Sequence, residues 1–318
     1  MAAERVHTTA HHVNVAAPAG VVYELVAGAA RWPLHLPHSV HVEQLDFDGR
    51  SERLRMWATD GGQVTSWTSH RRRFPRSRRI TFRRQAPDAY GARLLGTWIV
   101  EAAGARRSRL TLLHDVVVEG GGPACAARAL HGADRAGRAD LDALSRIAER
   151  CSRLDELTLL FEESVRVRGG AELVYDFLYR AADWPGRIPH VSRSDVTEAE
   201  PGVQVLSMDT TTADGCTHTT ESVRVCFPHA GRIVHKQTLT PALLTAHTGE
   251  WSVVPDASGV TASALHSVVL REENIEAVLG PGATVADARR HVRAWLGRDS
   301  LATLELAKRH AGALVRML

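Results

Sequence analysis

Lysine is scarce in this chain of 318 residues, because only Lys236 and Lys308 are found among its 39 basic residues. We attribute this bias to a GC-rich genome, so arginine counts alone say little about function. No apolar run approaches the ~18 residues that a membrane-spanning helix needs, so we expect no integral membrane protein. The first fifteen residues lack the apolar core of a secretion signal. We therefore expect a cytoplasmic protein.

Cysteine is also rare, and none of the four cysteines belongs to a CxxC pair. A chain of this length needs no disulfide to stabilise its core, so we expect four reduced thiols. They are Cys125, Cys151, Cys216 and Cys226.

Motifs of common metal and cofactor enzymes are absent as well. The 17 histidines include no HExxH motif and no Cys/His ligand spacing, and the chain has no aspartate-rich loop. There is no GxGxxG segment after a strand, no Walker loop and no GxSxG elbow. We therefore expect neither a metal nor a cofactor, and we do not favour a serine hydrolase.

The overall composition is that of a globular protein, with 44% hydrophobic and 24% charged residues. The net charge of +3 conceals an asymmetry between the two halves of the chain. Residues 1–152 carry 22 basic and 15 acidic side chains, whereas residues 153–318 carry 17 and 21. The length allows either two domains of the usual ~100–200 residues or one large domain.

An internal repeat decides between these alternatives. Residues 15–33 read VAAPAGVVYELVAGAARWP, and residues 167–185 read VRGGAELVYDFLYRAADWP. Further matches at nearly the same offset are Phe74-Pro75 with Phe227-Pro228, Gly96 with Gly249, Trp98 with Trp251, and His114 with His266. The period is far longer than that of a solenoid, so each copy needs its own core. We predict two domains, at residues 1–152 and 153–318.

Each copy has the pattern of an α+β domain. In the first copy, a strand at residues 9–15 leads into a short amphipathic helix, which we expect the Trp-Pro pair at 32–33 to end. Six strand-like segments and a long helix at about 125–149 follow. Consecutive strands form an antiparallel sheet, which must bury one face against the long helix. If the curled sheet is not filled, a cavity remains between sheet and helix.

One predicted strand, TSWTSHRRR, presents an unusual face. Alternation places Trp67, Ser69 and Arg71 together. An aromatic ring, a hydroxyl and a guanidinium suit the wall of a pocket for an oxygen-rich molecule, although an exposed strand in an arginine-rich chain would also explain them. The second copy keeps Ser222 and Arg224 at the same phase, which supports the pocket interpretation.

The repeated tryptophans and histidines leave two interpretations open. Trp98 and Trp251 fit core positions as well as pocket positions. His114 and His266 are either buried neutral imidazoles bonded to backbone, or proton donors and acceptors in a cavity. The ordinary histidine pKa near 6.5 suits the second role.

A basic run of eight arginines extends from Arg71 to Arg84. An exposed basic patch attracts an acidic partner, although a simply solvated face is an equal alternative. The interleaved aromatic residues lie on the opposite face of the strand, so the run offers no stacking platform for bases. We therefore expect no nucleic-acid partner.

The segments VVYEL, RWPLHLPHS, SWTSHR and GTW together resemble the aromatase/cyclases of bacterial type II (aromatic) polyketide synthases. The duplicated layout is similar to the two-domain branch of that family and covers essentially the whole chain. The resemblance implies a helix-grip fold of the START or pollen-allergen type. In this fold an antiparallel sheet wraps a long C-terminal helix and leaves an interior cavity.

The resemblance also implies pocket residues. The pocket arginine, serine and tryptophan of the family match Arg71, Ser69 and Trp67, and a polar residue near the end of the sheet matches His114. The tryptophans that match are Trp32 and Trp98, with Trp184 and Trp251 at the corresponding places of the second copy. We expect these four residues and Gln85, which stands near a further pocket position, to bind substrate. The sequence departs from single-domain relatives at Ser39, where they have a tyrosine, and near Gln85, where they have an arginine.

The implied substrate is a poly-β-ketone thioester on an acyl carrier protein, made by a ketosynthase/chain-length factor pair and a ketoreductase. The implied reaction closes the first ring between carbons 7 and 12 after reduction at carbon 9, and then removes water. Arg71 would stabilise the oxyanions, and His114 or Ser69 would move protons through water. The second copy would complete the dehydration or support the first, through Ser222, Arg224, Trp251 and His266.

The basic strand from Arg72 to Arg84 is the expected dock for the acidic carrier protein. The main alternative function is a non-catalytic lipid or small-molecule carrier with the same fold. A nucleic-acid-binding module that uses the arginine run is a weaker alternative.

Overall fold

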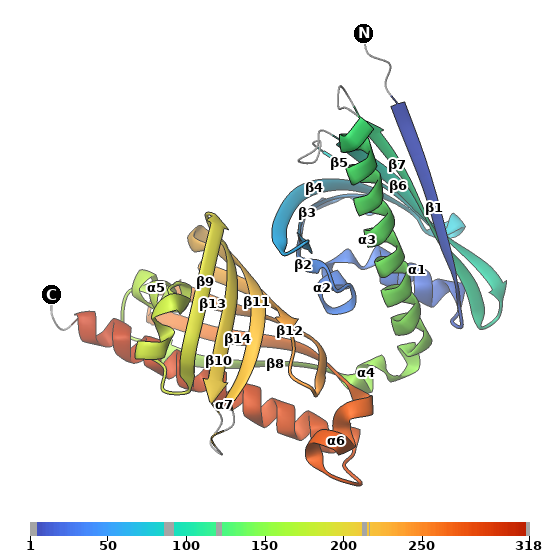
Figure 1. Cartoon of the computed structure of the whole chain (residues 1–318). Coiled ribbons are helices and arrows are strands. Elements are labelled where there is room, and N and C mark those ends of the chain that lie inside the picture. The colour runs from blue at the N-terminus through green and yellow to red at the C-terminus, as the bar shows by residue number, and fades with distance from the viewer. Residues whose placement is uncertain (1–4, 86–91, 119–122, 212–214, 216, 316–318) are drawn as a thin grey trace. The chain divides into compact units, whose positions relative to one another are not determined.

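A computed structural model describes the chain apart from residues 1–4, 86–91, 119–122, 212–214, 216 and 316–318. The chain divides into Met1–Leu154, here called unit 1, and Asp155–Leu318, called unit 2. Each unit contains one seven-stranded antiparallel sheet and one long C-terminal helix (Figure 1). The expected α+β helix-grip architecture is therefore confirmed.

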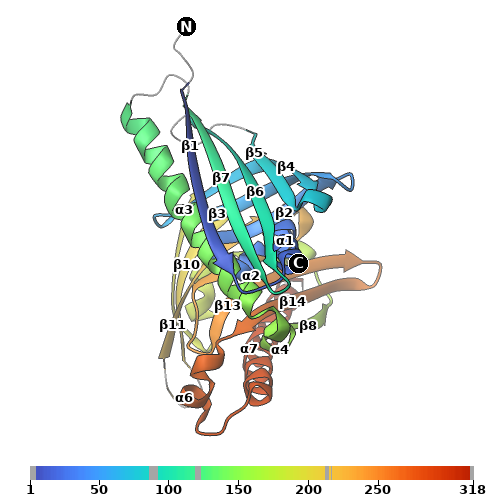
Figure 2. The same cartoon turned by 90° about the vertical axis from the view of Figure 1, so that its right-hand side faces the viewer.

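Unit 1 winds its sheet around a single helix. Its strands are β1 (Arg5–Val15), β2 (Ser39–Phe47), β3 (Ser51–Asp60), β4 (Gln63–Phe74), β5 (Arg79–Arg84), β6 (Ala92–Gly104) and β7 (Arg107–Val118). Its main helices are α1 (Ala19–Ala27), α2 (Trp32–His35) and α3 (Pro123–Glu149). The strand order β1-β7-β6-β5-β4-β3-β2 is a meander with the first strand added beside the last. Figure 2 shows α3 running along β1 and β7.

Unit 2 repeats this plan. Its strands are β8 (Thr158–Val167), β9 (Val191–Glu200), β10 (Val203–Thr211), β11 (Thr217–Phe227), β12 (Arg232–Leu239), β13 (Leu244–Asp256) and β14 (Gly259–Leu270). Its helices are α4 (Leu154–Leu157), which begins at the last residue of unit 1, α5 (Ala171–Tyr179), α6 (Ile275–Leu279) and α7 (Val285–Val315). The strand order β8-β14-β13-β12-β11-β10-β9 matches that of unit 1.

The Trp-Pro pair behaves differently from the prediction in unit 1. Helix α1 ends at Ala27, before the pair, and Trp32 begins the separate short helix α2. Pro33 lies in the first turn of α2, where its missing N–H group would have no helical partner in any case. The proline therefore starts a helix here and does not end one.

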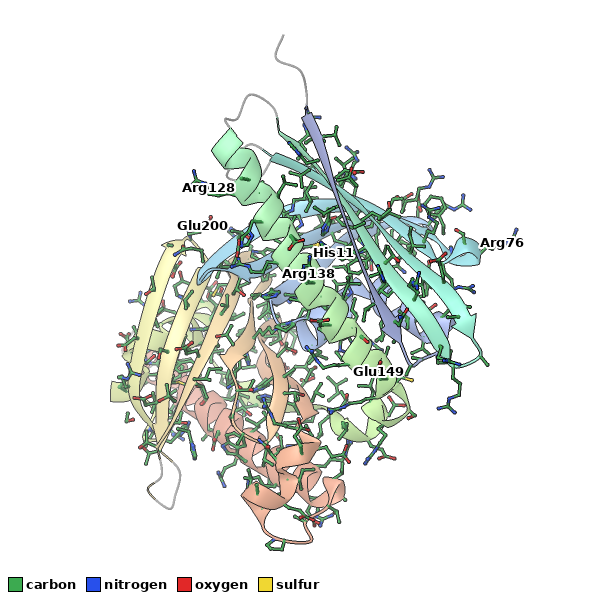
Figure 3. The ribbon with its side chains drawn as sticks, turned by 45° about the vertical axis from the view of Figure 1, so that its right-hand side comes forward. His11, Arg76, Arg128, Arg138, Glu149 and Glu200 are labelled. Atoms are coloured by element: carbon green, nitrogen blue, oxygen red, sulfur yellow. The ribbon has the colours of Figure 1, made fainter. Side chains whose placement is uncertain are left out.

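Other expectations about the chain can be compared with the described residues. No helix in the described part of the chain is long and apolar enough to cross a membrane. Cys151 and Cys226 are free thiols. The side chain of Cys125 and all of Cys216 lie outside the described residues. On β1, His11 Nε2 lies 2.8 Å from Asp134 of α3, which also pairs with Arg138. Figure 3 labels His11 and Arg138.

Strand register places one row of inward-facing residues straight across each sheet. We call this the interior row. In unit 1 the paired residues are, in order across the sheet, Glu52, Arg71, Phe82, Gly96, His114 and Thr9. In unit 2 they are Gln204, Arg224, His235, Gly249, His266 and Phe161. From strand to strand, each row therefore has an arginine, a residue with a ring side chain, a glycine and a histidine in the same order.

The glycine of each row makes room for the neighbouring ring. A Cβ atom on Gly96 would lie 2.3 Å from Cζ of Phe82, and one on Gly249 would lie 2.4 Å from Cε1 of His235. Both distances are far below van der Waals contact. Only a residue without a side chain lets the ring lean over the middle of the sheet.

The histidine of each row separates two apolar clusters. Along β7, Leu112 belongs to the main core of unit 1, whereas Val116 packs in a small second cluster. Along β14, Ala264 and Val268 belong to two different clusters of unit 2. His114 and His266 lie between these residues in sequence and on the same face of their strands. A polar layer therefore interrupts the core at the same level of both units.

We predict that Gly96→Ala destabilises unit 1 by about 1–3 kcal/mol, the usual cost of overpacking, because its methyl group would displace the Phe82 ring. Denaturant unfolding of the full chain measures this change. Gly132→Ala is the control, since a Cβ at this position in α3 meets nothing within 4 Å. It should leave stability unchanged or raise it by about 0.5–1 kcal/mol. Equal effects of the two substitutions would contradict the packing argument.

Candidate functional site

Arg71 is the most heavily engaged residue of the interior row in unit 1. Its side chain is buried, and its terminal nitrogens donate hydrogen bonds to the carbonyls of Val26 at 2.6 Å and Ala27 at 3.4 Å. These are the last carbonyls of α1, which have no partner within the helix. Glu52, which is equally buried, lies 3.0 Å from the guanidinium. Arg71 therefore fastens strand β4 to the end of α1.

Burial also sets the charge state of this group. Desolvation lowers the pKa of Arg71 to about 10, and the neighbouring Glu52 carboxylate opposes the shift. The guanidinium therefore keeps its charge at neutral pH. Its Nε atom is buried and has no hydrogen-bond partner. Of the groups on this side chain, Nε is the one that is left for a ligand.

Arg224 repeats the arrangement in unit 2. Its terminal nitrogens donate to the carbonyls of Leu178 at 2.5 Å and Tyr179 at 3.3 Å, which are the last residues of α5. Its Nε also lacks a partner. Gln204 occupies the position of Glu52 in the row, so no carboxylate of the row faces this arginine. The recurrence shows that the arginine has a structural function in both units.

The tryptophans of the two Trp-Pro pairs, Trp32 and Trp184, contact these buried arginines. Trp32 donates from Nε1 to the carbonyl of Leu25 at 3.2 Å, and the Arg71 guanidinium lies 4.9 Å from the centre of its ring. Trp184 donates to Phe177 at 3.1 Å, with Arg224 at 5.4 Å from its ring centre. Such contacts combine cation–π attraction with apolar burial.

The other predicted tryptophans are core or near-core residues. Trp98 is 3% exposed and meets Trp32 edge to face, with ring centres 6.4 Å apart. Trp251 is buried in the core of unit 2. Trp67 is only partly buried and packs against the core of unit 1 from β4. Trp67 is therefore the least enclosed of these rings.

The hydroxyl groups predicted beside the arginines lie where alternation placed them. Ser69 is buried on β4, two residues from Arg71, and pairs with Leu54 and Arg84 across the sheet. Ser222 is buried on β11 and pairs with Gln237 of β12. Both serines therefore lie one row away from the interior row.

His114 lies under helix α3 with an unused ring nitrogen. Its side chain is 6% exposed, and its ring meets the Phe82 ring edge to face with centres 5.8 Å apart. Gly137 of α3 allows this approach, because a Cβ there would lie 3.2 Å from Cε1 of His114. Burial lowers the pKa of His114 to about 4, so the imidazole is neutral at pH 7. Its Nδ1 is buried without a partner.

The structure does not bring Gln85 together with these residues. Gln85 is exposed at the end of β5, and its backbone N–H donates to Thr68. Arg84, one residue earlier, instead shares the inward face with Phe82, and its guanidinium lies 4.2 Å from the centre of the Trp67 ring. Alternation counted from Phe82 could have identified Arg84 in the sequence.

Tyr23 is a second group that the sequence-based prediction missed. It is buried on α1, its hydroxyl has no hydrogen-bond partner, and burial raises its pKa. Its counterpart Tyr175 has the same unpartnered hydroxyl and a pKa raised by burial. The repeat of Val-Tyr in the two copies was the available signal.

Unit 2 places three histidines on the inward face of its sheet, with the half-buried His235 and the buried His266 in the interior row and the buried His247 beside them. His247 Nε2 and His266 Nδ1 are 3.0 Å apart, and His266 Nε2 is 3.1 Å from the hydroxyl of Ser300 on α7. The rings of His247 and His266 stack with centres 5.3 Å apart, and His235 meets His247 edge to face. Burial lowers the pKa of His235 to about 3, that of His266 to about 4, and that of His247 well below 6.5.

Metal binding has no support in the described part of the chain. No group of three or more His, Cys, Asp or Glu side chains there has the geometry to hold a metal ion. Of the three histidines near the interior row of unit 2, His247 and His266 are hydrogen-bonded to each other, and His235 meets His247 through a ring contact. The histidines and arginines of the two interior rows can make hydrogen bonds, and the histidines can transfer protons.

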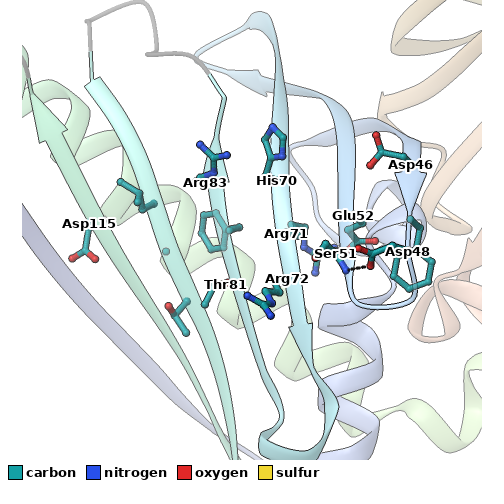
Figure 4. Close-up of a pocket in the computed structure, with 15 residues that line it drawn as sticks. Asp46, Asp48, Ser51, Glu52, His70, Arg71, Arg72, Thr81, Arg83 and Asp115 are labelled. Carbon is teal, nitrogen blue, oxygen red and sulfur yellow. Dashed lines mark hydrogen bonds and ion pairs between the residues drawn. The ribbon is translucent and has the colours of Figure 1, made fainter.

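A groove of about 750 Å³ lies on the outer face of the unit 1 sheet. Figure 4 shows His70, Arg72, Thr81 and Arg83 beside one another on β4 and β5. These residues alternate with Ser69, Arg71 and Phe82, so their side chains lie on the opposite face of the sheet from the interior row. Members of the interior row also line the groove, namely Glu52, Arg71, Phe82 and Gly96.

The acidic residues that line this groove already have partners. Asp46 pairs with Arg53 at 2.9 Å, Asp48 accepts the backbone N–H groups of Arg50 and Ser51, and Asp115 accepts the hydroxyl of Thr8. Arg72 and Arg83 make no ion pair within the described residues. The groove therefore presents guanidinium groups that can still bind an anion.

Comparisons with known proteins give a consistent result. The family model described as "Polyketide cyclase / dehydrase and lipid transport" matches residues 15–144. The chain is 38% identical over 307 residues to the granaticin polyketide synthase bifunctional cyclase/dehydratase of Streptomyces violaceoruber, covering 96% of this chain and 93% of that protein. It is 39% identical to the actinorhodin polyketide synthase bifunctional cyclase/dehydratase of Streptomyces coelicolor, with 96% and 97% covered.

Two solved structures are similar over nearly their whole length. The di-domain ARO/CYC BexL from the BE-7585A biosynthetic pathway is 46% identical, with a TM-score of 0.87, and the match covers 96% of this chain and 98% of BexL. The di-domain ARO/CYC StfQ from the steffimycin biosynthetic pathway is 34% identical, with a TM-score of 0.84 and coverage of 96% and 99%.

The buried histidines predict an acid-sensitive unit 2. Their pKa values lie below the unfolded value of about 6.5, so the unfolded chain binds protons first as the pH falls. The stability that they provide is complete above pH ~6.5 and is lost toward pH 4. His266, whose pKa is lowered to about 4, should by itself cost about 2 kcal/mol between pH 8 and pH 5, and the lowered pKa values of His235 and His247 act in the same direction. Denaturant unfolding across this range should show the unit 2 transition falling faster than that of unit 1.

Substitution distinguishes this effect from general acid sensitivity. His266→Gln removes one titrating group and should flatten the pH dependence of the unit 2 transition. His229→Gln, at an exposed turn, should leave the dependence unchanged. A dependence that is identical in all three proteins would show that the buried histidines are not its cause.

Proposed function

Since the chain belongs to the bifunctional cyclase/dehydratases of type II polyketide synthases, we propose that it closes the first ring of a carrier-bound poly-β-ketone and dehydrates it. The ring closes between carbons 7 and 12 of a chain already reduced at carbon 9. Loss of water then makes the ring aromatic. The observation that carries this proposal is the interior row of unit 1, where His114 offers an unpartnered ring nitrogen within a layer between two apolar clusters.

Proximity is the first contribution of such an interior. A methylene between two carbonyls is already acidic, so the enzyme must chiefly bend the chain until the right carbon meets the right carbonyl. Phe82 within the row and Trp67 beside it provide flat aromatic walls. The rings of Trp32 and Trp98, which contact each other, belong to the same core. Walls of this kind exclude water from a reactive chain and oppose its other foldings.

His114 is the proposed proton carrier. As a neutral imidazole, it accepts a proton from the carbon beside the hydroxyl-bearing carbon at Nδ1. The electron pair of the broken C–H bond forms the new C=C bond. The hydroxyl group leaves as water after it takes up a proton, which the imidazolium can return. Ser69, one row away, would hold a water molecule for this transfer.

Guanidinium groups are the proposed partners of the oxyanions. Because the terminal nitrogens of Arg71 are committed to α1 and Glu52, this residue can act on substrate only through Nε. Arg84 is a second candidate, since its guanidinium lies against Trp67 on the same face. An arginine in a water-poor site stabilises an enolate or alkoxide with directed donors. The Arg71 guanidinium also packs against the Trp32 ring and so holds that ring in place.

Unit 2 is proposed to support the reaction of unit 1. Arg224 and Trp184 repeat the fastening of Arg71 and Trp32, and Ser222 repeats Ser69. His266 and Trp251 occupy the positions of His114 and Trp98. Both ring nitrogens of His266, however, are already hydrogen-bonded, Nδ1 to His247 and Nε2 to Ser300. It is therefore a weaker candidate than His114 for completing the dehydration.

The acyl carrier protein is proposed to dock on the outer face of unit 1. Arg72 and Arg83 line the groove there, and the basic turn at Arg76, labelled in Figure 3, extends the patch. An acidic carrier would be steered by this charge. The ketosynthase/chain-length factor pair and the ketoreductase are the partners that would supply the substrate.

A ligand carrier without catalysis is the second candidate function. The description of the matching family model includes lipid transport, and the interior row could hold a ligand without changing it. The two functions differ in stoichiometry, because an enzyme turns over whereas a carrier acts only in proportion to its amount.

A reconstituted synthase tests the proposed reaction. Carrier protein, ketosynthase pair and ketoreductase are combined with substoichiometric protein, and products are identified by mass. Wild type should replace shunt products by one product with a dehydrated aromatic ring. His114→Phe should lower this rate by about 10²-fold or more, within the usual contribution of a general acid or base. Gln85→Ala, an exposed change, is the matched control and should act as wild type.

The outcomes separate the two functions. An unchanged product profile with wild type would overturn the cyclase proposal and favour the carrier. Full activity in His114→Phe would remove His114 from the mechanism while leaving the reaction standing.

Charge reversal tests the docking surface in the same reaction. The double substitution Arg72→Glu/Arg83→Glu should raise the KM for carrier-bound substrate about tenfold at low salt and leave kcat nearly unchanged, because it touches only the outer face. Arg109→Glu, on β7 outside this groove, is the control. A loss of kcat with unchanged KM would argue against docking at this surface.

A further inference from the structure

The three histidines of unit 2 are not required by the fold. Residues at the same places in unit 1 are Phe82 for His235 and Leu94 for His247. Those two apolar residues fill their positions within a sheet of the same order. Unit 2 has instead placed two more imidazoles beside His266, where burial opposes their protonation. Such a replacement of apolar by polar groups costs stability unless the polar atoms find partners.

The hydrogen bonds among these groups have a defined direction. Ser300 Oγ is 2.7 Å from the carbonyl of Leu296, one turn earlier on α7, and donates its proton there. Ser300 therefore accepts a hydrogen bond from His266 Nε2–H. A neutral imidazole has one N–H group, so His266 Nδ1 is bare and accepts from His247 Nε2–H.

The chain of hydrogen bonds ends at an unused acceptor. Because His247 is also neutral and its proton is on Nε2, its Nδ1 carries a lone pair. This atom is buried and has no partner, and the side chain is only 4% exposed. The Oε1 atom of Gln237 and the Nδ1 atom of His235 are buried nearby on β12, also without partners. Native interiors leave few such atoms unsatisfied.

The rings around this acceptor form an aromatic stack. Phe161 stacks on His266 with centres 4.9 Å apart, and His266 stacks on His247. The group lies where the core of unit 2 is divided into two apolar clusters. A flat ligand with a hydroxyl group would match these surroundings, because its O–H would satisfy the acceptor in the plane of the His247 ring and its apolar ring would lie among aromatic and apolar side chains.

We propose that unit 2 contains a second interior site that binds a planar hydroxylated aromatic ring, with His247 Nδ1 accepting the hydrogen bond of the ring hydroxyl. His235 and Gln237 line the same site. His266 and Ser300 are positioning residues, since they act by fixing the proton of His247 on Nε2. This site differs from the interior row of unit 1 and requires no chemistry there.

Binding of 1-naphthol tests the proposal with a probe of defined chemistry, and naphthalene is the probe that lacks the hydroxyl. Calorimetric titration of the full chain should show 1-naphthol binding about tenfold more tightly than naphthalene, the value of one good hydrogen bond. His247→Leu, which introduces the residue of unit 1, should remove this preference and keep naphthalene binding. His229→Gln, on the exposed turn after β11, should preserve the preference.

Nitrogen-15 spectra of the imidazoles provide a readout that a structural role would not change. The wild-type signal of His247 Nδ1 should have the shift of a bare ring nitrogen and should move upfield when 1-naphthol is added. This measurement needs no variant, so it stands even if His247→Leu does not fold. No shift on saturation, or equal affinity for the two probes, would overturn the proposal. Because no polyketide is involved, failure of the cyclase reaction would leave this result unaffected.

Discussion

A buried arginine that fastens a central strand to the end of a helix is the interaction on which the rest of each unit depends. The last carbonyls of α1 cannot bond within the helix, and burying them unpaired would cost about 1–3 kcal/mol each. Arg71 satisfies them from β4 and also covers Trp32. Arg224 does the same in unit 2. The short helix, the Trp-Pro tryptophan and the sheet are thereby held in one arrangement.

This fastening has a consequence for catalysis. An arginine whose terminal nitrogens are occupied is a rigid part of the wall and can meet substrate only through Nε, so proton transfer depends on a different group with an unused atom. His114 is such a group, since burial keeps it neutral and its Nδ1 has no partner. Its place between two apolar clusters keeps water away, which strengthens any hydrogen bond that it makes.

The two units share one strand order but differ in the polar side chains of their interior rows. Register alignment equates Phe82 with His235, and Gly96 with Gly249. Both rows contain the glycine, which makes room for the neighbouring ring, and the arginine, which binds the carbonyls at the end of the short helix. The ring beside the glycine differs between the units, and in unit 2 it is His235, which meets His247 edge to face beside the hydrogen-bonded pair of His247 and His266. Two copies of a fold can thus divide reaction and binding between them.

The sequence by itself determined the duplication, the α+β order and the inward face of β4, because repeats and alternation are properties of the chain. It could not decide what Arg71 does, since its partners at Val26 and Ala27 are 45 and 44 residues away. Only the tertiary structure showed the arginine bonded to a helix end, Gln85 exposed, and His247 joined to His266. Hydrogen bonding and burial depend on which distant residues meet, and local pattern does not contain that information.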